Sequence, residues 1–177
     1  MTTGGGSAAD PELVIPIVSA VVYDSTARRC ILLQRRDKPG EPVQGRLELP
    51  GGRWEAGERP DVAIAREIVE ETGIAVTAVA AGVTVRRGAP DGGTATALPL
   101  AVVTGIDGGF SSMHVLFECY GEGTPRPVPG ETADTRWWRV EEVLDLLDTE
   151  PTAFIPHTEA MLLVALARVS PPREPRP

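Results

Sequence analysis

The sequence is short of positive charge, cysteine and histidine. Its 177 residues contain 17 Lys and Arg against 25 Asp and Glu, for a net charge of −8. Nucleic acids and anionic membranes bind clustered Lys and Arg, so we expect neither as a partner. Cys30 and Cys119 lie in apolar runs and predict buried apolar residues, with a disulfide unnecessary. His114 and His157 lack a complementary Cys or Asp spacing, and we expect structural or exposed roles for them.

Long apolar runs are absent too. The longest, LVIPIVSAVVY over residues 13–23, contains Pro16 and is too short to cross a bilayer. Residues 1–10 have neither a basic start nor an apolar block, so no targeting segment is predicted. No internal repeat is visible. We therefore expect a cytoplasmic protein with a single domain over residues 13–170, a flexible tail at 1–12 and a disordered tail at 171–177.

What the sequence does have is a dense acidic pattern, GRWEAGERPDVAIAREIVEETGI, over residues 52–74. Glu70 and Glu71 follow Glu67 by three and four positions, so on a helix the three carboxylates project from one strip. Like charges at this spacing cost an isolated helix roughly 0.2–0.5 kcal/mol per pair, and a bound divalent ion reverses that cost. Oxygen ligands suit hard cations, so the strip predicts a Mg²⁺ or Mn²⁺ site.

The segment resembles the Nudix signature, G-x5-E-x7-R-E-U-x-E-E-x-G-U with U an apolar residue. Every fixed position matches: Gly52, Glu58, Arg66, Glu67, Ile68, Glu70, Glu71, Gly73 and Ile74. A solvated acidic helix face is the alternative, but the glycines and Arg66 at their required offsets argue against it. The resemblance implies an α/β fold, a Nudix-type α/β/α sandwich with a mixed β-sheet and a catalytic loop–helix.

The resemblance also implies roles for individual residues. Glu67, Glu70 and Glu71, with the Gly52 carbonyl, would hold the metal, and one of these glutamates would be the general base. Arg66 would pair with Glu58 to hold the loop against the helix, although an i,i+4 contact with Glu70 fits the spacing equally well. A downstream glutamate often joins the metal shell in this family. The candidates are Glu118, Glu122 and Glu131; we favour Glu131, with Asp134 a close rival.

Arginines near the signature are candidates for binding the substrate's phosphates. Arg35 and Arg36 end an apolar run where family members often carry a phosphate-binding arginine. Arg46 and Arg53 flank the glycine turn and could reach a diphosphate. An acidic protein needs such local arginines and a metal to hold an anionic small molecule, so we expect a nucleotide as the partner.

The signature is physically coherent as strand, loop and helix. Residues 47–49 form a short run stopped by Pro50, and Gly51–Gly52 permits a tight turn. Pro60 and Asp61 suit the first turn of a helix, and Gly73 suits its end. The predicted buried side of the helix consists of Ala63, Ile64, Ile68 and Val69. Trp54 is expected to pack in the core rather than stack on a base.

Alternating and apolar runs predict the remaining elements. A hairpin is expected between strands 15–23 and 30–35, with its turn at residues 24–27. Further strands are predicted at 76–85, 97–103, 114–120 and 135–140, separated by turns at 91–93, 107–109 and 123–130. Helices are predicted at 141–147 and 157–169.

The substrate is the least determined feature. LELPGG over residues 47–52 resembles the ELPAG-like turn of ADP-ribose and nucleotide-sugar pyrophosphatases, although Gly51 departs from its alanine. Pro90 lies where ADP-ribose hydrolases tend to carry proline. We predict Mg²⁺-dependent hydrolysis of the pyrophosphate of a nucleoside diphosphate linked to another moiety X. The alternatives are a pyrophosphohydrolase that sanitises nucleoside triphosphates and a nucleotide-binding regulatory module without turnover.

Such pyrophosphatases commonly form dimers. The apolar run over residues 13–23 exceeds what one alternating strand needs to bury, and a homodimer is therefore possible. The alternative is a central strand buried on both faces within one chain.

Overall fold

The computed structural model describes residues 13–89, 92–105 and 112–168. The tails predicted at 1–12 and 171–177, the proline marker Pro90 and the turn at 107–109 lie outside the described residues. The elements are β1 (Ile15–Tyr23), β2 (Cys30–Arg36), β3 (Leu47–Glu48), β4 (Gly51–Arg53), α1 (Pro60–Thr72), β5 (Ala75–Val79), β6 (Thr84–Ala89), β7 (Gly92–Thr96), β8 (Ala101–Thr104), β9 (Ser112–Glu122), β10 (Thr132–Arg139), α2 (Val140–Thr149), a 3₁₀ turn (Pro151–Ala153) and α3 (Pro156–Ala167).

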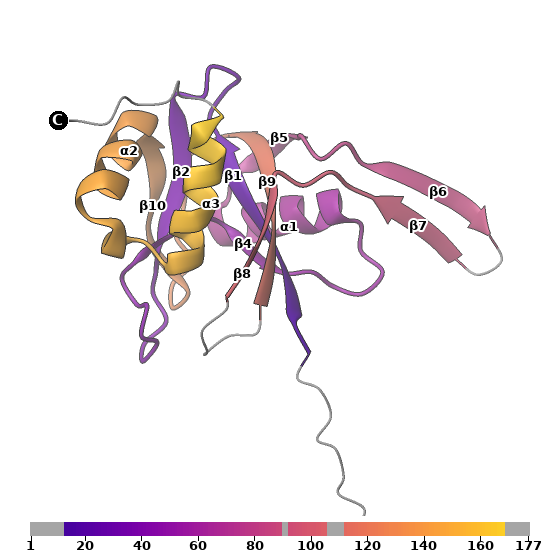
Figure 1. The fold of residues 1–177 in the computed structure, drawn as a ribbon, viewed down its shortest axis with the longest axis horizontal. Coiled ribbons are helices and arrows are strands. Elements are labelled where there is room, and N and C mark those ends of the chain that lie inside the picture. The colour runs from indigo at the N-terminus through magenta and orange to yellow at the C-terminus, as the bar shows by residue number, and fades with distance from the viewer. Residues whose placement is uncertain (1–12, 90–91, 106–111, 169–177) are drawn as a thin grey trace, which may run out of the picture.

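Eight strands form one mixed sheet with the order β10-β2-β1-β9-β5. The short strands β3, β4 and β8 pair with β2, β1 and β9. β1 runs parallel to β9 and antiparallel to β2 and β4, so the sheet is mixed, as expected. Helix α1 covers one face, and α2 and α3 cover the other (Figure 1). The predicted α/β/α sandwich is confirmed.

Each face of the sheet has its own apolar layer. Val18, Ala20 and Val22 of β1 pack towards α1, whereas Val21 and Tyr23 pack towards α2 and α3. β1 is therefore buried on both faces from Val18 onward, which favours the central-strand alternative for the apolar run. The exposed part of the apolar run is its start, Leu13, Val14, Ile15 and Pro16. The homodimer stays a prediction. Among the described residues, no helix is long and apolar enough to cross a membrane.

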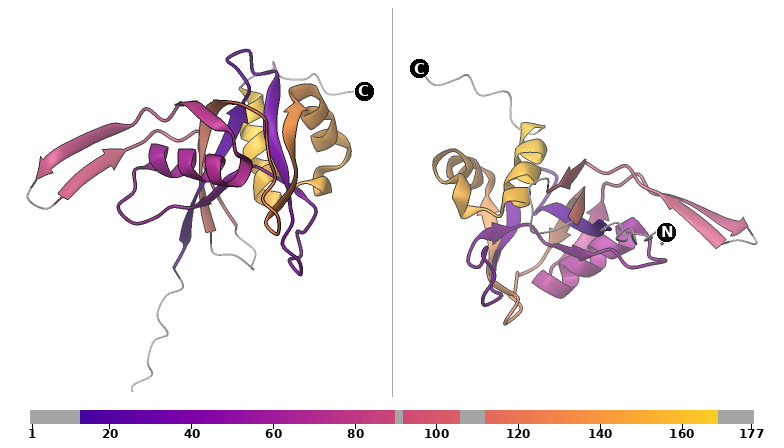
Figure 2. Two further views of the ribbon diagram at one scale, coloured as in Figure 1. Left: turned by 180° about the vertical axis from the view of Figure 1, so that it is seen from behind. Right: turned by 60° about the horizontal axis from the view of Figure 1, so that its bottom comes forward.

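The strand predictions hold at the centre of the sheet and fail at one side. The hairpin of β1 and β2 is confirmed, whereas the single strand predicted over residues 76–85 is wrong. That segment divides into β5 and β6 around Gly82, whose φ of +51° belongs to the left-handed region. β6 pairs with β7 in a separate two-stranded ribbon that projects from the body (Figures 1 and 2).

Helix α1 begins and ends where its sequence predicts. Pro60 occupies the first turn, and Gly73 ends the helix at φ +68° with its N–H donating to the Val69 carbonyl. Ala63, Ile64 and Ile68 are buried as expected, but Val69 is half exposed. Thr72 is buried in its place, because its hydroxyl donates to the Ile68 carbonyl at 2.5 Å and satisfies its polar atom inside the protein.

Candidate active site

Two glycines allow the loop before α1 to press against the sheet. Gly51 pairs with Ser19 and Gly52 with Val18 across β4 and β1. A Cβ at Gly51 would lie 2.2 Å from the Val18 carbonyl oxygen, and one at Gly52 would lie 2.3 Å from Oε2 of Glu67. At Gly51 the backbone of β1 excludes a side chain, which explains why this residue is not the alanine of the ELPAG-like turn, whereas at Gly52 a side chain would displace the Glu67 carboxylate. Gly52 and Glu67, both predicted metal ligands, are thereby brought together.

Arg66 gathers the outer carboxylates of α1. Its guanidinium donates to both oxygens of Glu58, at 3.0 and 2.9 Å, and to the Arg53 carbonyl at 3.3 Å. It also contacts Glu67 at 2.7 Å and Glu70 at 3.1 Å. Both partners that the sequence left open for Arg66, Glu58 and Glu70, are therefore present at once. The hydrogen bonds from Arg66 hold the pKa of Glu58 below its ordinary value.

Glu71 points inward and uses different partners. Its Oε2 accepts from the Gly51 N–H at 3.0 Å and from the Gln34 side-chain amide at 2.9 Å. Burial raises its pKa to about 7 in spite of these donors. Burial also raises the pKa of Glu67, and Arg66 opposes that shift. The predicted strip is thus divided into an outer side that carries arginine and an inner side that is desolvated.

Two residues on the inner side, Glu48 and Gln34, were not predicted from the sequence. Glu48 on β3 is 7% exposed, and burial followed by repulsion from Glu71 raises its pKa to about 7. Gln34 on β2 is 1% exposed. Both are polar residues within apolar runs, LEL and LLQ, and that interruption was the available signal. Strand alternation places them on the α1 face, opposite Leu33, Leu47 and Leu49.

The four candidate arginines occupy different environments. Arg36 contacts Glu41 through two hydrogen bonds, at 2.7 and 3.0 Å, and lies 3.6 Å from Glu48. Arg35 instead donates to the Gly45 carbonyl at 2.8 Å and lies 3.4 Å from Asp134. Arg46 contributes its backbone carbonyl to the Arg36 N–H, and Arg53 is exposed. Of the four, Arg36 alone contacts a carboxylate on the inner side, that of Glu48.

The downstream carboxylates lie further from α1. Glu131 is half exposed and lies 3.8 Å from the Lys38 ammonium, yet its charge still contributes to raising the pKa of Glu71. Asp134, its rival, contacts Arg35 and Arg136 at 3.4 Å each. Glu118 lies on the opposite face of the sheet, where Arg28 contacts it at 2.5 Å. Of these residues, Glu131 retains an electrostatic connection with the strip.

The donor set suits a hard divalent cation. No three Asp, Glu, His or Cys side chains converge as a metal cluster within the ranges that the structure describes. The guanidinium of Arg66 holds Glu67 and Glu70, so a positive charge already lies among these carboxylates. Because Gly52 has no side chain, the Glu67 carboxylate can lie close to the backbone at that position. All candidate ligands are oxygens, which fits Mg²⁺ or Mn²⁺ and not a soft metal.

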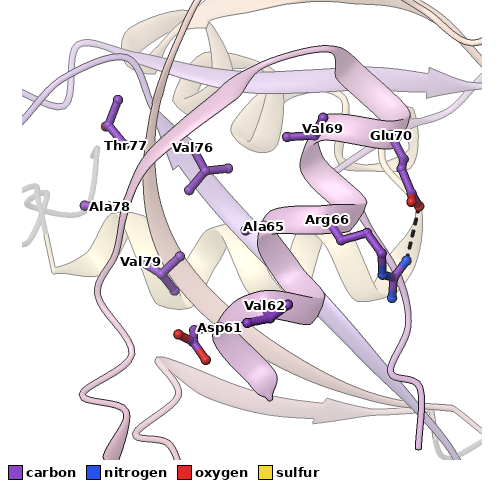
Figure 3. A pocket seen from close by; sticks show the side chains of 10 residues that line it. All are labelled: Asp61, Val62, Ala65, Arg66, Val69, Glu70, Val76, Thr77, Ala78 and Val79. Atoms are coloured by element: carbon purple, nitrogen blue, oxygen red, sulfur yellow. Dashed lines mark hydrogen bonds and ion pairs between the residues drawn. The ribbon is translucent and has the colours of Figure 1, made fainter. Parts of the chain in front are cut away.

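A shallow groove follows the outer flank of α1 (Figure 3). It has a volume of about 700 Å³, and Val62 and Val69 of α1 face Val76 and Val79 of β5 across it. Arg66 and Glu70 lie at one end, joined by their ion pair, whereas the inner carboxylates do not line the groove. The outer side of the strip, at Arg66 and Glu70, is thus open to this groove.

The two histidines lie on the α3 face. Their rings stack with centroids 4.1 Å apart, and His114 contacts the hydroxyls of Ser19 at 3.1 Å and Ser112 at 3.2 Å. Burial lowers the pKa of both, that of His157 to about 4. The structural role expected for them is supported, but they are partners of each other and not isolated.

Comparisons with known proteins agree with this architecture. A Mycobacterium tuberculosis protein provisionally named 8-oxo-dGTP diphosphatase 2 is 44% identical over 63 residues, which make up 35% of this chain and 44% of that protein. A Mus musculus protein named ADP-sugar pyrophosphatase is 36% identical over 74 residues, 41% of this chain and 31% of that protein. The matches thus span less than half of the curated relatives.

Solved structures share the fold. A MutT NUDIX hydrolase from Burkholderia pseudomallei has a TM-score of 0.61 at 24% identity, over 86% of this chain and 98% of that one. The NUDIX domain of Shewanella oneidensis NrtR, solved with ADP ribose, has a TM-score of 0.60 at 15% identity, over 94% and 95%. A family model described as the NUDIX domain matches residues 14–158. Because that match covers most of the chain and includes the complete signature, the chain belongs to the Nudix hydrolase family.

Proposed function

We propose that the protein uses Mg²⁺ or Mn²⁺ to hydrolyse the pyrophosphate linkage of a nucleoside diphosphate joined to another moiety X, such as ADP-ribose or a nucleotide sugar. The observation that carries the proposal is the meeting of Gly52, Glu67 and Glu71 where the loop before α1 presses against the sheet. Carboxylates held this closely repel each other and an anionic substrate unless a cation joins them.

In this proposal, Glu67, Glu70, Glu71 and the Gly52 carbonyl hold the cation, with Glu131 as a further carboxylate. When bound, a divalent cation neutralises phosphate oxygens and makes a water molecule more acidic. The water attacks one phosphorus in line, the bond from that phosphorus to the bridging oxygen breaks, and one of the three α1 glutamates accepts the proton. The products are a nucleoside monophosphate and phosphorylated X.

In this proposal the arginines have two roles, positioning of the carboxylates and binding of the phosphates. Arg66 holds α1 against the loop through Glu58, a contact that fixes where the carboxylates lie. Arg36 is the first candidate for a phosphate, because it already lies beside Glu48 on the inner side. Arg35, Arg46 and Arg53 are the candidates at the rim.

A nucleoside triphosphate is the second candidate substrate, and two observations favour it. The Mycobacterium tuberculosis relative bears an 8-oxo-dGTP diphosphatase name, and the space around Gly51 cannot take the alanine of the ELPAG-like turn. Hydrolysis would then release a nucleoside monophosphate and pyrophosphate. A third candidate, nucleotide binding without turnover, would leave the full set of carboxylates without a catalytic task.

The test is product analysis on a mixed panel. Purified protein is incubated with ADP-ribose, nucleotide sugars, dinucleoside polyphosphates, dNTPs and 8-oxo-dGTP, with Mg²⁺ or with a chelator, and products are separated chromatographically. We expect metal-dependent release of a nucleoside monophosphate without pyrophosphate. Pyrophosphate as the co-product would select the second candidate.

Two variants serve as controls for the panel. Glu71→Gln should be inactive on every substrate, and Glu141→Gln, which changes an exposed glutamate on α2, should match the parent protein. Tight nucleotide binding without any product would select the binding module instead.

A further inference from the structure

Glu48 is a buried carboxylate with an unsatisfied oxygen. Its side chain lies on β3 between the buried residues Leu47 and Leu49, and its Oε1 has no hydrogen-bond partner. A buried charged oxygen without a partner costs free energy, because water no longer solvates it. Glu48 therefore needs a proton, a donor or a cation that the described residues do not supply.

The charges around Glu48 are mixed: Arg36 and Lys38 lower its pKa, whereas Glu71 raises it. The side-chain amide of Gln34 donates to Glu71, and Gln34 pairs with Glu48 across β2 and β3, so one amide lies beside two carboxylates. The neighbouring guanidinium of Arg36 lies 3.6 Å from Glu48 but 2.7 Å from Glu41. One arginine thus serves two carboxylates, and the closer of the two is Glu41.

The opposite face of the sheet holds a partly buried glutamate, Glu118, whose carboxylate is satisfied. Glu118 receives a hydrogen bond from Arg28 at 2.5 Å and another from the Tyr120 hydroxyl at 2.5 Å. The same carboxylate oxygen accepts both. Glu48 has a comparable exposure but no contact of that length among the described residues. Its inner position beside Glu71 therefore calls for a further cation.

We propose that Glu48 and Glu71 together ligate a divalent cation on the sheet side of α1, which makes Glu48 a metal ligand outside the signature. The proposal rests on the proposed function, because Glu71 belongs to both. Two carboxylates and a neighbouring amide oxygen form a hard, oxygen-only set, the kind that Mg²⁺ and Mn²⁺ prefer. The competing explanation is a protonated Glu48 that needs no metal.

Metal binding without any nucleotide tests the proposal directly. Free Mn²⁺ is titrated into the chelator-treated protein and followed by electron paramagnetic resonance, which counts bound ions and gives their affinity. We expect Glu48→Gln to lose one bound ion or to weaken its binding by about tenfold or more. The matched control is Glu118→Gln, which changes a partly buried glutamate beside an arginine on the other face and should bind Mn²⁺ like the parent protein.

The thermal unfolding of the same variants without metal shows whether they fold. If Glu48→Gln does not fold, Glu48→Asp keeps the charge, shortens its reach and should still weaken Mn²⁺ binding. Unchanged stoichiometry and affinity in the folded variant would overturn the proposal and favour the protonated carboxyl. If the protein hydrolyses substrate but Glu48→Gln binds Mn²⁺ like the parent, the proposed function stands and the Glu48 site is wrong. If Mn²⁺ binding depends on Glu48 but no substrate is hydrolysed, the cation site stands and the proposed function is wrong.

Discussion

The α1 face and the α3 face of the sheet hold buried ionisable groups in different ways. On the α1 face, burial raises the pKa values of Glu48 and Glu71 to about 7. On the α3 face, His114 and His157 stack on each other, and burial keeps them neutral. The first arrangement gains from binding a cation, whereas the second is complete without a ligand. Cation binding should therefore change the α1 face and leave the α3 face unaffected.

The largest expected effect is the difference in kcat between variants on the α1 face and a variant on the α3 face. Glu71→Gln or Glu70→Gln should lower kcat by a factor of about 10² or more, because each change removes the charge of a proposed metal ligand from the α1 strip. His157→Phe on the α3 face should leave kcat within about twofold. Steady-state kinetics at saturating Mg²⁺ measure both. An active double glutamate variant with an unchanged Mg²⁺ dependence would contradict the mechanism.

Arg66→Met on α1 should lower the free energy of unfolding more than an exposed arginine change on the α3 side. Removing the guanidinium leaves Glu58, Glu67 and Glu70 without their shared partner, and we expect a loss of about 1–2 kcal/mol in metal-free urea unfolding. Millimolar Mg²⁺ should recover part of that loss, because the ion supplies charge at the same carboxylates. Arg168→Met, an exposed change at the end of α3, is the control and should stay within about 0.5 kcal/mol. Equal losses in the two variants would remove the special role of Arg66.

On the α3 face, acid should act through His157. The folded pKa of His157, about 4, lies below its unfolded value of roughly 6.5, so the unfolded state binds more protons between these values. Through His157, the free energy of unfolding therefore falls by about 1–2 kcal/mol as the pH is lowered from 7 to 5. Its neighbours His114 and Arg36 oppose its protonation in the folded state.

The measurement is the difference between parent and His157→Phe in urea midpoints at pH 7 and pH 5. The difference is needed because the raised pKa values of Glu48 and Glu71 act with the opposite sign in this window. We expect the variant to lose less stability on acidification than the parent. Equal losses would show that the stack titrates normally.

The smallest expected effect is the stabilisation by metal alone. At a Mg²⁺ concentration ten times its Kd, binding to the folded state contributes about 1.4 kcal/mol, or roughly 3–6 °C in Tm. Glu48→Gln and Glu71→Gln should reduce the shift, and His157→Phe should keep it. A Tm that does not respond to Mg²⁺ or Mn²⁺ in the parent protein would count against a preformed site.

The sequence predicted the α1 strip because its chemistry is local. Spacing along one helix places Glu67, Glu70 and Glu71 together, and the glycines and Pro60 mark the loop and helix ends. Glu48 and Gln34 were missed because they come from two strands and join the strip only through sheet pairing. Val69 was assigned to the core because helical periodicity does not show that β5 leaves it uncovered. Which arginine faces the acids also depended on strand alternation, which local sequence does not fix.

The pairing of β1 with β9 has a consequence for how the chain folds. Ile15 lies opposite Ser112 and Tyr23 opposite Tyr120, so the two central strands meet across almost a hundred residues. β2 and β4 can dock on β1 early, but the parallel partner arrives only after most of the chain has been synthesised. Until then one edge of the most apolar strand is open to other chains. We therefore expect slow refolding whose yield falls as protein concentration rises, even though the signature helix forms from local contacts.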